Sequence, residues 1–291
     1  MPEVTVILVN YNDKAHLGDC LLSLKEKAVG IDFEAIVVDN ASSDGSLEFI
    51  ADRFPWVKAI RNSENCGFGR ANNQALKESW SDFVLFLNTD TVIYPEALQT
   101  LLQEMKNETA IGVIAPALLT SENTCQVSFG TSVTFLAELL KKSFWNFFLK
   151  SKLRIWQKRK AVSWVGGACL LARRKALDEV GGFDENFFLY FEDIDLCFRI
   201  KRCGWKIIFL PQIRIFHQGG ASAAAQKPWN RLEYRKSQVY FYRKHNSWLS
   251  LFLLRRYLRL NFWLLSARGT FKGAENAILR SGYLELLKTR K

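Results

Sequence analysis

The chain has 291 residues, of which 48% are hydrophobic and 24% are charged, and its formal net charge is +11. This composition supports a sizeable core and excludes a disordered chain. The N-terminal MPEVTVILVNYN has no basic region, and no run reaches 18 uncharged apolar residues. We therefore expect neither a signal peptide nor a membrane-spanning helix. Six cysteines without a C-x-x-C pair favour free thiols in a reducing compartment.

The first half of the chain alternates between short apolar runs and helical patterns. Strands are predicted at 4–9 (VTVILV), 34–40 (EAIVVDN), 57–61 and 83–90 (FVLFLNTD). Helices are predicted at about 15–28 and 46–53, and after a glycine-containing loop that begins at residue 65. Alternation of this kind indicates an α/β fold with a parallel sheet, in which sites lie beyond the carboxyl ends of the strands.

The second half is less regular. Strands are predicted at 111–118, 164–172 and 206–210, the last ending at Pro211, and a helix at about 193–202. Residues 135–160 form a basic, aromatic segment that we interpret as a helical insertion, and the chain beyond about 230 is expected to be helical. We divide the chain into a domain at 1–245 and a basic helical tail at 246–291.

Asp39 and Arg70 are candidate nucleotide-binding residues. Asp39 ends a strand and could accept a hydrogen bond from a base N–H. The alternative is an Asx-turn or an N-cap for the following ASSDGS turn. The loop 65-NCGFGRANN-73 brings glycines, Arg70 and a helix N-terminus together, a combination that suits phosphate, and an ordinary glycine turn is the alternative.

Asp90 and His217 are candidate metal ligands. Asp90 ends the run FVLFLNTD, where a carboxylate can hold a divalent cation together with phosphate oxygens, unless it only caps the strand. His217 is one of three histidines and has a metal role only if it reaches the same cation, in which case an imidazole favours Mn²⁺ over Mg²⁺.

Three carboxylates follow the aromatic stretch FFLYF. Asp193 and Asp195 fit the start of a helix, as an N-cap and a first-turn acid. That explanation leaves open why Glu192 and Asp193 directly follow an apolar stretch. Acids at a helix start beside an apolar cleft suit a general base.

Taken in order, these motifs carry a family resemblance. VTVILVNYN, EAIVVDNASSDGS, NCGFGRANN, FLNTDT, SWVGGACLLARR, VGGFDENFFLYFEDIDLCFRIKRCGW and HQGG resemble the inverting glycosyltransferases of family two, most closely their bacterial rhamnosyltransferase-like branch. The resemblance covers about residues 3–245. It implies a GT-A type, Rossmann-like, mainly parallel sheet flanked by helices, here with a C-terminal helical extension.

The resemblance also implies roles for matching residues. It implies that Asp39 and Tyr11 bind the base of the nucleotide and that Arg70 binds the diphosphate. It also implies that Asp90 and His217 bind a Mg²⁺ or Mn²⁺ ion. Asn88 stands where the family has a further carboxylate of the nucleotide and metal site. Gly166 and Gly167 match the stretch that lines the donor-sugar pocket, and Trp164 is expected to flank it. Asp193 matches the catalytic base, and Glu192 supports it or holds the acceptor.

The implied activity is inverting transfer of a sugar from a nucleotide-diphosphate sugar to a saccharide, in cell-surface polysaccharide synthesis. Rhamnose, from dTDP-rhamnose, is the sugar that the resemblance favours. A metal-dependent nucleotidyltransferase is an alternative on a similar sheet. The non-catalytic alternatives are a sugar-nucleotide binder and a nucleic-acid binder; no nucleic-acid motif is present, and we expect no nucleic-acid partner.

The positive charge lies in two aromatic segments. Residues 135–160 and 248–291 each carry a net +7, so the rest of the chain carries −3. In 248-WLSLFLLRRYLRLNFWLL-265 arginines interrupt an apolar majority, which suits a helix lying in a membrane interface. A helix packed on the core is the alternative. We expect a bacterial cytoplasmic protein attached peripherally to the anionic inner face of the membrane, with a lipid-linked acceptor.

Overall fold

The computed structural model describes residues 1–120, 124–135, 158–219, 228–267 and 280–286. The contacts between residues divide the chain into two units. The first comprises the described residues up to 131, 158–188 and 192–219. The second comprises 132–135, 189–191 and the described residues from 228. Most of the predicted insertion, residues 136–157, lies outside the described residues.

The first unit begins with the predicted alternation. Its elements up to residue 87 are β1 (Val4–Asn10), α1 (Lys14–Lys27), β2 (Phe33–Asp39), α2 (Ser46–Arg53), β3 (Val57–Arg61), α3 (Phe68–Lys77) and β4 (Phe83–Leu87). The elements that follow are β5 (Thr91–Val92), α4 (Ala97–Asn107), β6 (Ile111–Leu119), β7 (Phe129–Gly130), β8 (Lys160–Val162), β9 (Trp164–Val165), β10 (Cys169–Arg173), α6 (Arg174–Val180), α7 (Glu192–Arg202) and β11 (Lys206–His217).

The sheet of this unit is mixed but mainly parallel, as predicted. Among the described residues it has nine strands in the order β3-β2-β1-β4-β10-β6-β11-β5, with β8 also paired to β11. Strands β1 to β4 are parallel, whereas β10 runs antiparallel to both β4 and β6. The register pairs Asn10 with Asp39 and Leu87 with Cys169, so the carboxyl ends of β1, β2 and β4 meet the start of β10.

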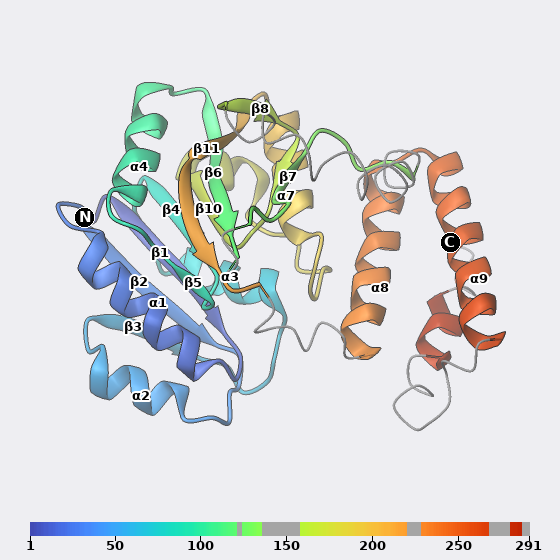
Figure 1. Ribbon diagram of the computed structural model, residues 1–291, viewed down its shortest axis with the longest axis horizontal. Coiled ribbons are helices and arrows are strands. Elements are labelled where there is room, and N and C mark those ends of the chain that lie inside the picture. The colour runs from blue at the N-terminus through green and yellow to red at the C-terminus, as the bar shows by residue number, and fades with distance from the viewer. Residues whose placement is uncertain (121–123, 136–157, 220–227, 268–279, 287–291) are drawn as a thin grey trace. The chain divides into compact units, whose positions relative to one another are not determined.

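Helices cover both faces of the sheet because the strand side chains alternate (Figure 1). Val4, Val6 and Leu8 pack with apolar residues of α1, α2 and α4 in one buried cluster. Ile7 belongs to a second cluster, which includes residues of α3, α6 and α7. Apolar side chains on both faces explain why the strands read as continuous hydrophobic runs.

Three features differ from the sequence predictions. The predicted strand 164–172 is two strands, β9 and β10, because the chain turns at Gly166 and Gly167. The predicted end at Pro211 is wrong, because β11 continues to His217 after a register shift between Leu210 and Arg214. The sequence analysis also missed α4 and α6.

The second unit is helical. Its long helices are α8 (Pro228–His245) and α9 (Trp248–Ala267), and residues 280–286 form a further helical segment. Leu232 of α8 packs in an apolar cluster with Tyr283 and Phe262. Within the described part of the chain, no helix combines the length and apolarity needed to cross a bilayer.

Candidate active site

Asp39 is completely buried at the end of β2. Its Oδ1 accepts a hydrogen bond from Asn10 Nδ2 (2.8 Å), and its Oδ2 accepts one from the Ser42 backbone N–H (2.9 Å). The second bond reaches three residues along the chain, one more than in an Asx-turn, and it ties Asp39 to the loop that follows it. Both oxygens therefore have protein partners, and Asp39 fixes the loop beyond β2. The other predicted base-binding residue, Tyr11, is 53% exposed beside this loop, one residue after Asn10.

The loop 65–70 is joined to the segment that precedes the Glu192–Asp193 pair. The Phe68 N–H donates to Phe188 O (2.9 Å), and a Cβ on Gly67 would lie 2.6 Å from the same oxygen. Glycine is required at this position because any side chain would collide with backbone.

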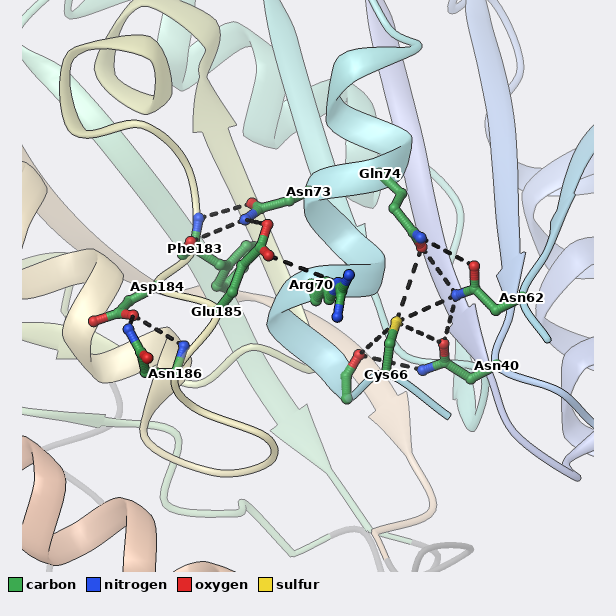
Figure 2. A network of polar contacts seen from close by, with 11 residues as sticks. Asn40, Asn62, Cys66, Arg70, Asn73, Gln74, Phe183, Asp184, Glu185 and Asn186 are labelled. Carbon is green, nitrogen blue, oxygen red and sulfur yellow. Dashed lines mark hydrogen bonds and ion pairs between the residues drawn. The ribbon is translucent and has the colours of Figure 1, made fainter. Parts of the chain in front are cut away.

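Arg70 points from the first turn of α3 toward the same segment (Figure 2). Its Nε lies 3.8 Å from Glu185 Oε2, and its side chain is about half exposed. Asn73 holds that segment by donating to Phe183 O (2.9 Å) and Glu185 Oε1 (3.0 Å). The guanidinium is thus accessible to an anion, with one distant carboxylate as its ion-pair partner.

Asp90 and His217 are brought together by the sheet, although 127 positions separate them. β11 pairs antiparallel with β5, which sets His217 opposite Thr91. His217 Nε2 lies 3.2 Å from Asp90 Oδ1, and both side chains are largely buried. Burial alone would raise the pKa of Asp90, but the hydrogen bond and charge of His217 outweigh it and lower that pKa.

This pair fits one divalent cation. Two ligands at right angles on an ion with bonds of about 2.1 Å lie roughly 3 Å apart, close to the observed separation. A carboxylate oxygen and an imidazole nitrogen suit Mn²⁺. The described residues contain no group of three metal-binding side chains, so Asp90 and His217 would hold the ion together with ligands from the substrate.

Asp193 lies against the glycine turn between β9 and β10. Its Oδ2 accepts a hydrogen bond from the Gly167 N–H (2.7 Å), and its Oδ1 accepts one from the Ile194 N–H (2.7 Å). A Cβ on Gly167 would lie 3.2 Å from the Asp193 Cβ. Burial raises the pKa of Asp193, while these N–H groups oppose the shift. Gly167, predicted for the sugar pocket, and Asp193, predicted as the general base, are thus in direct contact.

Glu192 is more deeply buried than its neighbour Asp193, with 5% of its surface exposed. Its Oε2 has no hydrogen-bond partner among the described residues. Burial, followed by the charge of Asp193, raises the pKa of Glu192 well above its usual value. Asp195, interpreted from sequence as a first-turn acid, is also buried, and it pairs with Arg199 Nε at 2.7 Å. The three acids therefore have three different environments.

Asn88 connects the Asp90 and Asp193 regions. The Asn88 N–H donates to Ala168 O (2.9 Å), one residue from the Gly167 that contacts Asp193. Asp90 lies two residues beyond Asn88. The pairing of β4 with β10 therefore brings both candidate acids to the same edge of the sheet.

Trp164 and Gly166 lie on the strand side of the glycine turn. The Trp164 ring packs where a Cβ on Gly130 would lie, and the Gly166 N–H donates to Ser128 O (2.7 Å). These contacts fix the turn that carries Gly167.

Sequence reasoning missed two residues that hold the predicted ones. Asn10 binds Asp39, and Gln126 binds His217 through two hydrogen bonds. Asn10 could have been found from its place at a strand end. Gln126 has no such signal, since it lies at no predicted strand end and 91 positions from its partner.

Comparisons with known proteins agree with the family resemblance found in the sequence. The family model for glycosyl transferase family 2 matches residues 5–181. An N-acetylglucosaminyl-diphospho-decaprenol L-rhamnosyltransferase of Mycobacterium tuberculosis is 26% identical over 267 residues, covering 84% of this chain and 85% of that protein. Rhamnosyltransferase WbbL of Escherichia coli is 26% identical, covering 74% and 83%.

Among solved structures, a mannosyltransferase from Pyrobaculum calidifontis, in complex with GDP-Man and Mn²⁺, has a TM-score of 0.56 at 19% identity. The match covers 99% of this chain and 81% of that one. At this identity the likeness concerns the fold, and it agrees with the GT-A type sheet expected from the sequence.

Proposed function

The chain belongs to glycosyl transferase family 2, and from that premise we propose that it moves a sugar from a nucleotide-diphosphate sugar to a hydroxyl group of a saccharide, with inversion. One observation carries this proposal. The Asp90–His217 pair and the Gly167–Asp193 contact lie at one sheet edge, connected through Asn88 and Ala168. A cation-binding pair and a partly buried carboxylate are thus available to one substrate.

Asp193 acts as the general base. Its carboxylate takes the proton of the acceptor hydroxyl as that oxygen forms a bond to the anomeric carbon. The bond from this carbon to the diphosphate breaks on the opposite face, and the nucleoside diphosphate leaves with the electron pair. Gly167 and Ile194 hold the carboxylate in place through their N–H groups. One displacement of this kind inverts the anomeric configuration.

The leaving group develops negative charge, and Arg70 is the exposed cation placed to meet it. Asp90 and His217 would hold a divalent cation, Mn²⁺ in preference to Mg²⁺, which stabilises the charge on the diphosphate. Asp39 holds the loop beside the base, with Tyr11 exposed next to it, and Trp164, Gly166 and Gly167 line the sugar. Glu192 supports Asp193.

The relatives point to a donor and an acceptor. Both are rhamnosyltransferases by name, and the name of the mycobacterial protein includes N-acetylglucosaminyl-diphospho-decaprenol, a sugar linked to a lipid through a diphosphate. We therefore favour dTDP-rhamnose as donor and a polyprenyl-diphosphate-linked saccharide as acceptor, in cell-surface polysaccharide synthesis. This acceptor fits a bacterial enzyme held at the inner face of the cytoplasmic membrane.

The test combines product analysis with an isosteric variant. Incubation with dTDP-rhamnose, Mn²⁺ and a lipid-linked saccharide should release dTDP, and NMR of the product should show the anomeric configuration opposite to the donor's. Asp193→Asn should bind donor normally and lose at least about 100-fold in turnover, because it cannot accept the proton. Release of pyrophosphate would indicate a nucleotidyltransferase, and near wild-type turnover in Asp193→Asn would remove the base assignment.

A further inference from the structure

We infer that Gln126 is a positioning residue for cation binding: it holds the His217 ring so that Nε2 faces Asp90. This inference rests on the cation site of the proposed function. Gln126 Oε1 lies 2.7 Å from His217 Nδ1, and Gln126 Nε2 donates to the backbone oxygen of the same histidine at 2.9 Å. The Gln126 side-chain amide thus forms hydrogen bonds with both the ring and the backbone of His217.

The backbone contact determines which way the amide points. A carbonyl oxygen can only accept a hydrogen bond, so the amide NH₂ must face His217 O. The amide oxygen then faces Nδ1, and Nδ1 must carry a hydrogen. Nε2, 3.2 Å from Asp90 Oδ1, is left as the nitrogen that takes either a proton or a cation. Donation from the second ring nitrogen is the usual way in which proteins orient a metal-binding histidine.

The local backbone makes room for this contact. Beyond β6 the chain turns back, and the Gln126 N–H donates to Leu118 O (2.8 Å). Leu118 is paired with Ile215 of β11, so Gln126 returns beside the end of that strand. Gly219, with φ of +60°, leaves the space, because a Cβ there would lie 2.3 Å from Gln126 Nε2. Glycine at position 219, the first of the two in the HQGG motif, thus suits both its positive φ and the neighbouring amide.

Two substitutions separate ring orientation from loop closure. Gln126→Met removes both hydrogen bonds at similar volume, whereas Gln126→Glu keeps an acceptor for Nδ1–H but cannot donate to the backbone oxygen. Mn²⁺ affinity of the full chain, without donor, is read from the free-ion EPR signal. We expect Gln126→Met to bind Mn²⁺ about 10–100-fold more weakly and Gln126→Glu to stay within about threefold of wild type. Gln212→Met, an exposed glutamine on the same strand as His217, is the matched control and should change nothing.

A double-mutant cycle that combines Gln126→Met with His217→Ala completes the test. If Gln126 acts through the ring, Gln126→Met should have no further effect once the imidazole is gone. Wild-type affinity in Gln126→Met, or equal losses in Gln126→Met and Gln126→Glu, would overturn the inference, the latter because loop closure would then be the cause. If Asp90→Ala and His217→Ala bind Mn²⁺ as wild type does, the cation site itself fails. Circular dichroism melts establish that each variant is folded.

Discussion

Glu192 and Asp193 are neighbours in the chain, but their carboxylates have different surroundings. Asp193 accepts two backbone N–H groups, whereas Glu192 Oε2 is buried without a partner among the described residues. The charged form of Glu192 is therefore the costlier one, and its pKa is the more strongly raised of the two. As pH rises, Glu192 should therefore keep its proton longer than Asp193 does.

The pH profile of turnover should reflect Asp193. Its pKa is raised by burial, and a general base acts in its deprotonated form, so kcat/KM should fall with decreasing pH at a pH above the usual aspartate range. Because the pKa of Glu192 is raised more strongly than that of Asp193, Glu192 should lose its proton second as pH rises. Glu192→Gln, which mimics the neutral acid, should leave the acid limb within about 0.3 pH unit of wild type. An acid limb at or below the ordinary aspartate pKa would contradict the assignment.

Glu192 should also make stability depend on pH. Its folded pKa lies above the unfolded value of about 4.3, so the folded state binds the proton more tightly. The favourable contribution is complete below pH 4 and is lost as pH rises through the folded pKa. Urea melts at several pH values should show Glu192→Gln losing less stability than wild type over this interval. Parallel curves for the two proteins would argue against a buried, neutral Glu192.

At the scale of secondary-structure elements, one contact depends on a glycine. It joins the loop at residues 65–70, where α3 begins, to the segment before α7. Gly67 has φ of 86° and ψ of 170°, a conformation that is almost confined to glycine. Its Cα faces Phe188 O, which also accepts the Phe68 N–H. Arg70 and the Glu192–Asp193 pair lie on the two sides of this contact, so it holds the proposed donor-binding and catalytic residues together.

Two glycines allow this contact to be tested. Gly67→Ala should lower the free energy of unfolding by about 1–3 kcal/mol more than Gly30→Ala. Both positions have positive φ, but a Cβ on Gly30 would meet nothing within 4 Å, whereas one on Gly67 meets backbone. Urea denaturation measures the difference. Equal costs at the two positions would mean that the Phe188 contact is dispensable.

On the scale of the whole molecule, charge and exposed apolar surface coincide on α9. One side of this helix is buried through Leu254 and Leu258. Several large apolar side chains on it are exposed: Trp248, Leu249, Phe252, Leu253, Leu260, Trp263 and Leu264. Three arginines lie among them, and the helix has no acidic residue. This composition supports the proposal that α9 lies on an anionic membrane surface.

Vesicle sedimentation tests this proposal. The protein should bind vesicles containing phosphatidylglycerol and bind neutral phosphatidylcholine vesicles weakly, and high salt should release it, because the arginine contribution is screened. Leu260→Ser with Trp263→Ser should weaken binding about tenfold or more by removing exposed apolar contacts. Trp80→Ser, at an exposed tryptophan of the first unit, should not. Equal binding to both kinds of vesicle, or none, would count against the membrane surface.

The sequence by itself determined the α/β class, the first four strands and the helices between them. Residues close together in the chain dictate these features, through runs that are apolar on both faces and through the polar residues that follow them. It also indicated Asp90, Asp193 and the two glycines of the turn. The division at residue 245 stays a prediction, and the predicted strand end at Pro211 was wrong because pairing with β6 continues across a bulge.

Only the tertiary structure decided which residues meet. His217 reaches Asp90 because β11 lies beside β5. Gly167 reaches Asp193 because α7 packs against β9, the strand that precedes the glycine turn. Gln126 binds the histidine only because the chain turns back after β6. The difference in burial between the Glu192 and Asp193 side chains likewise comes from tertiary packing. Such contacts join positions up to 127 residues apart, and local sequence patterns carry no information about pairing at that range.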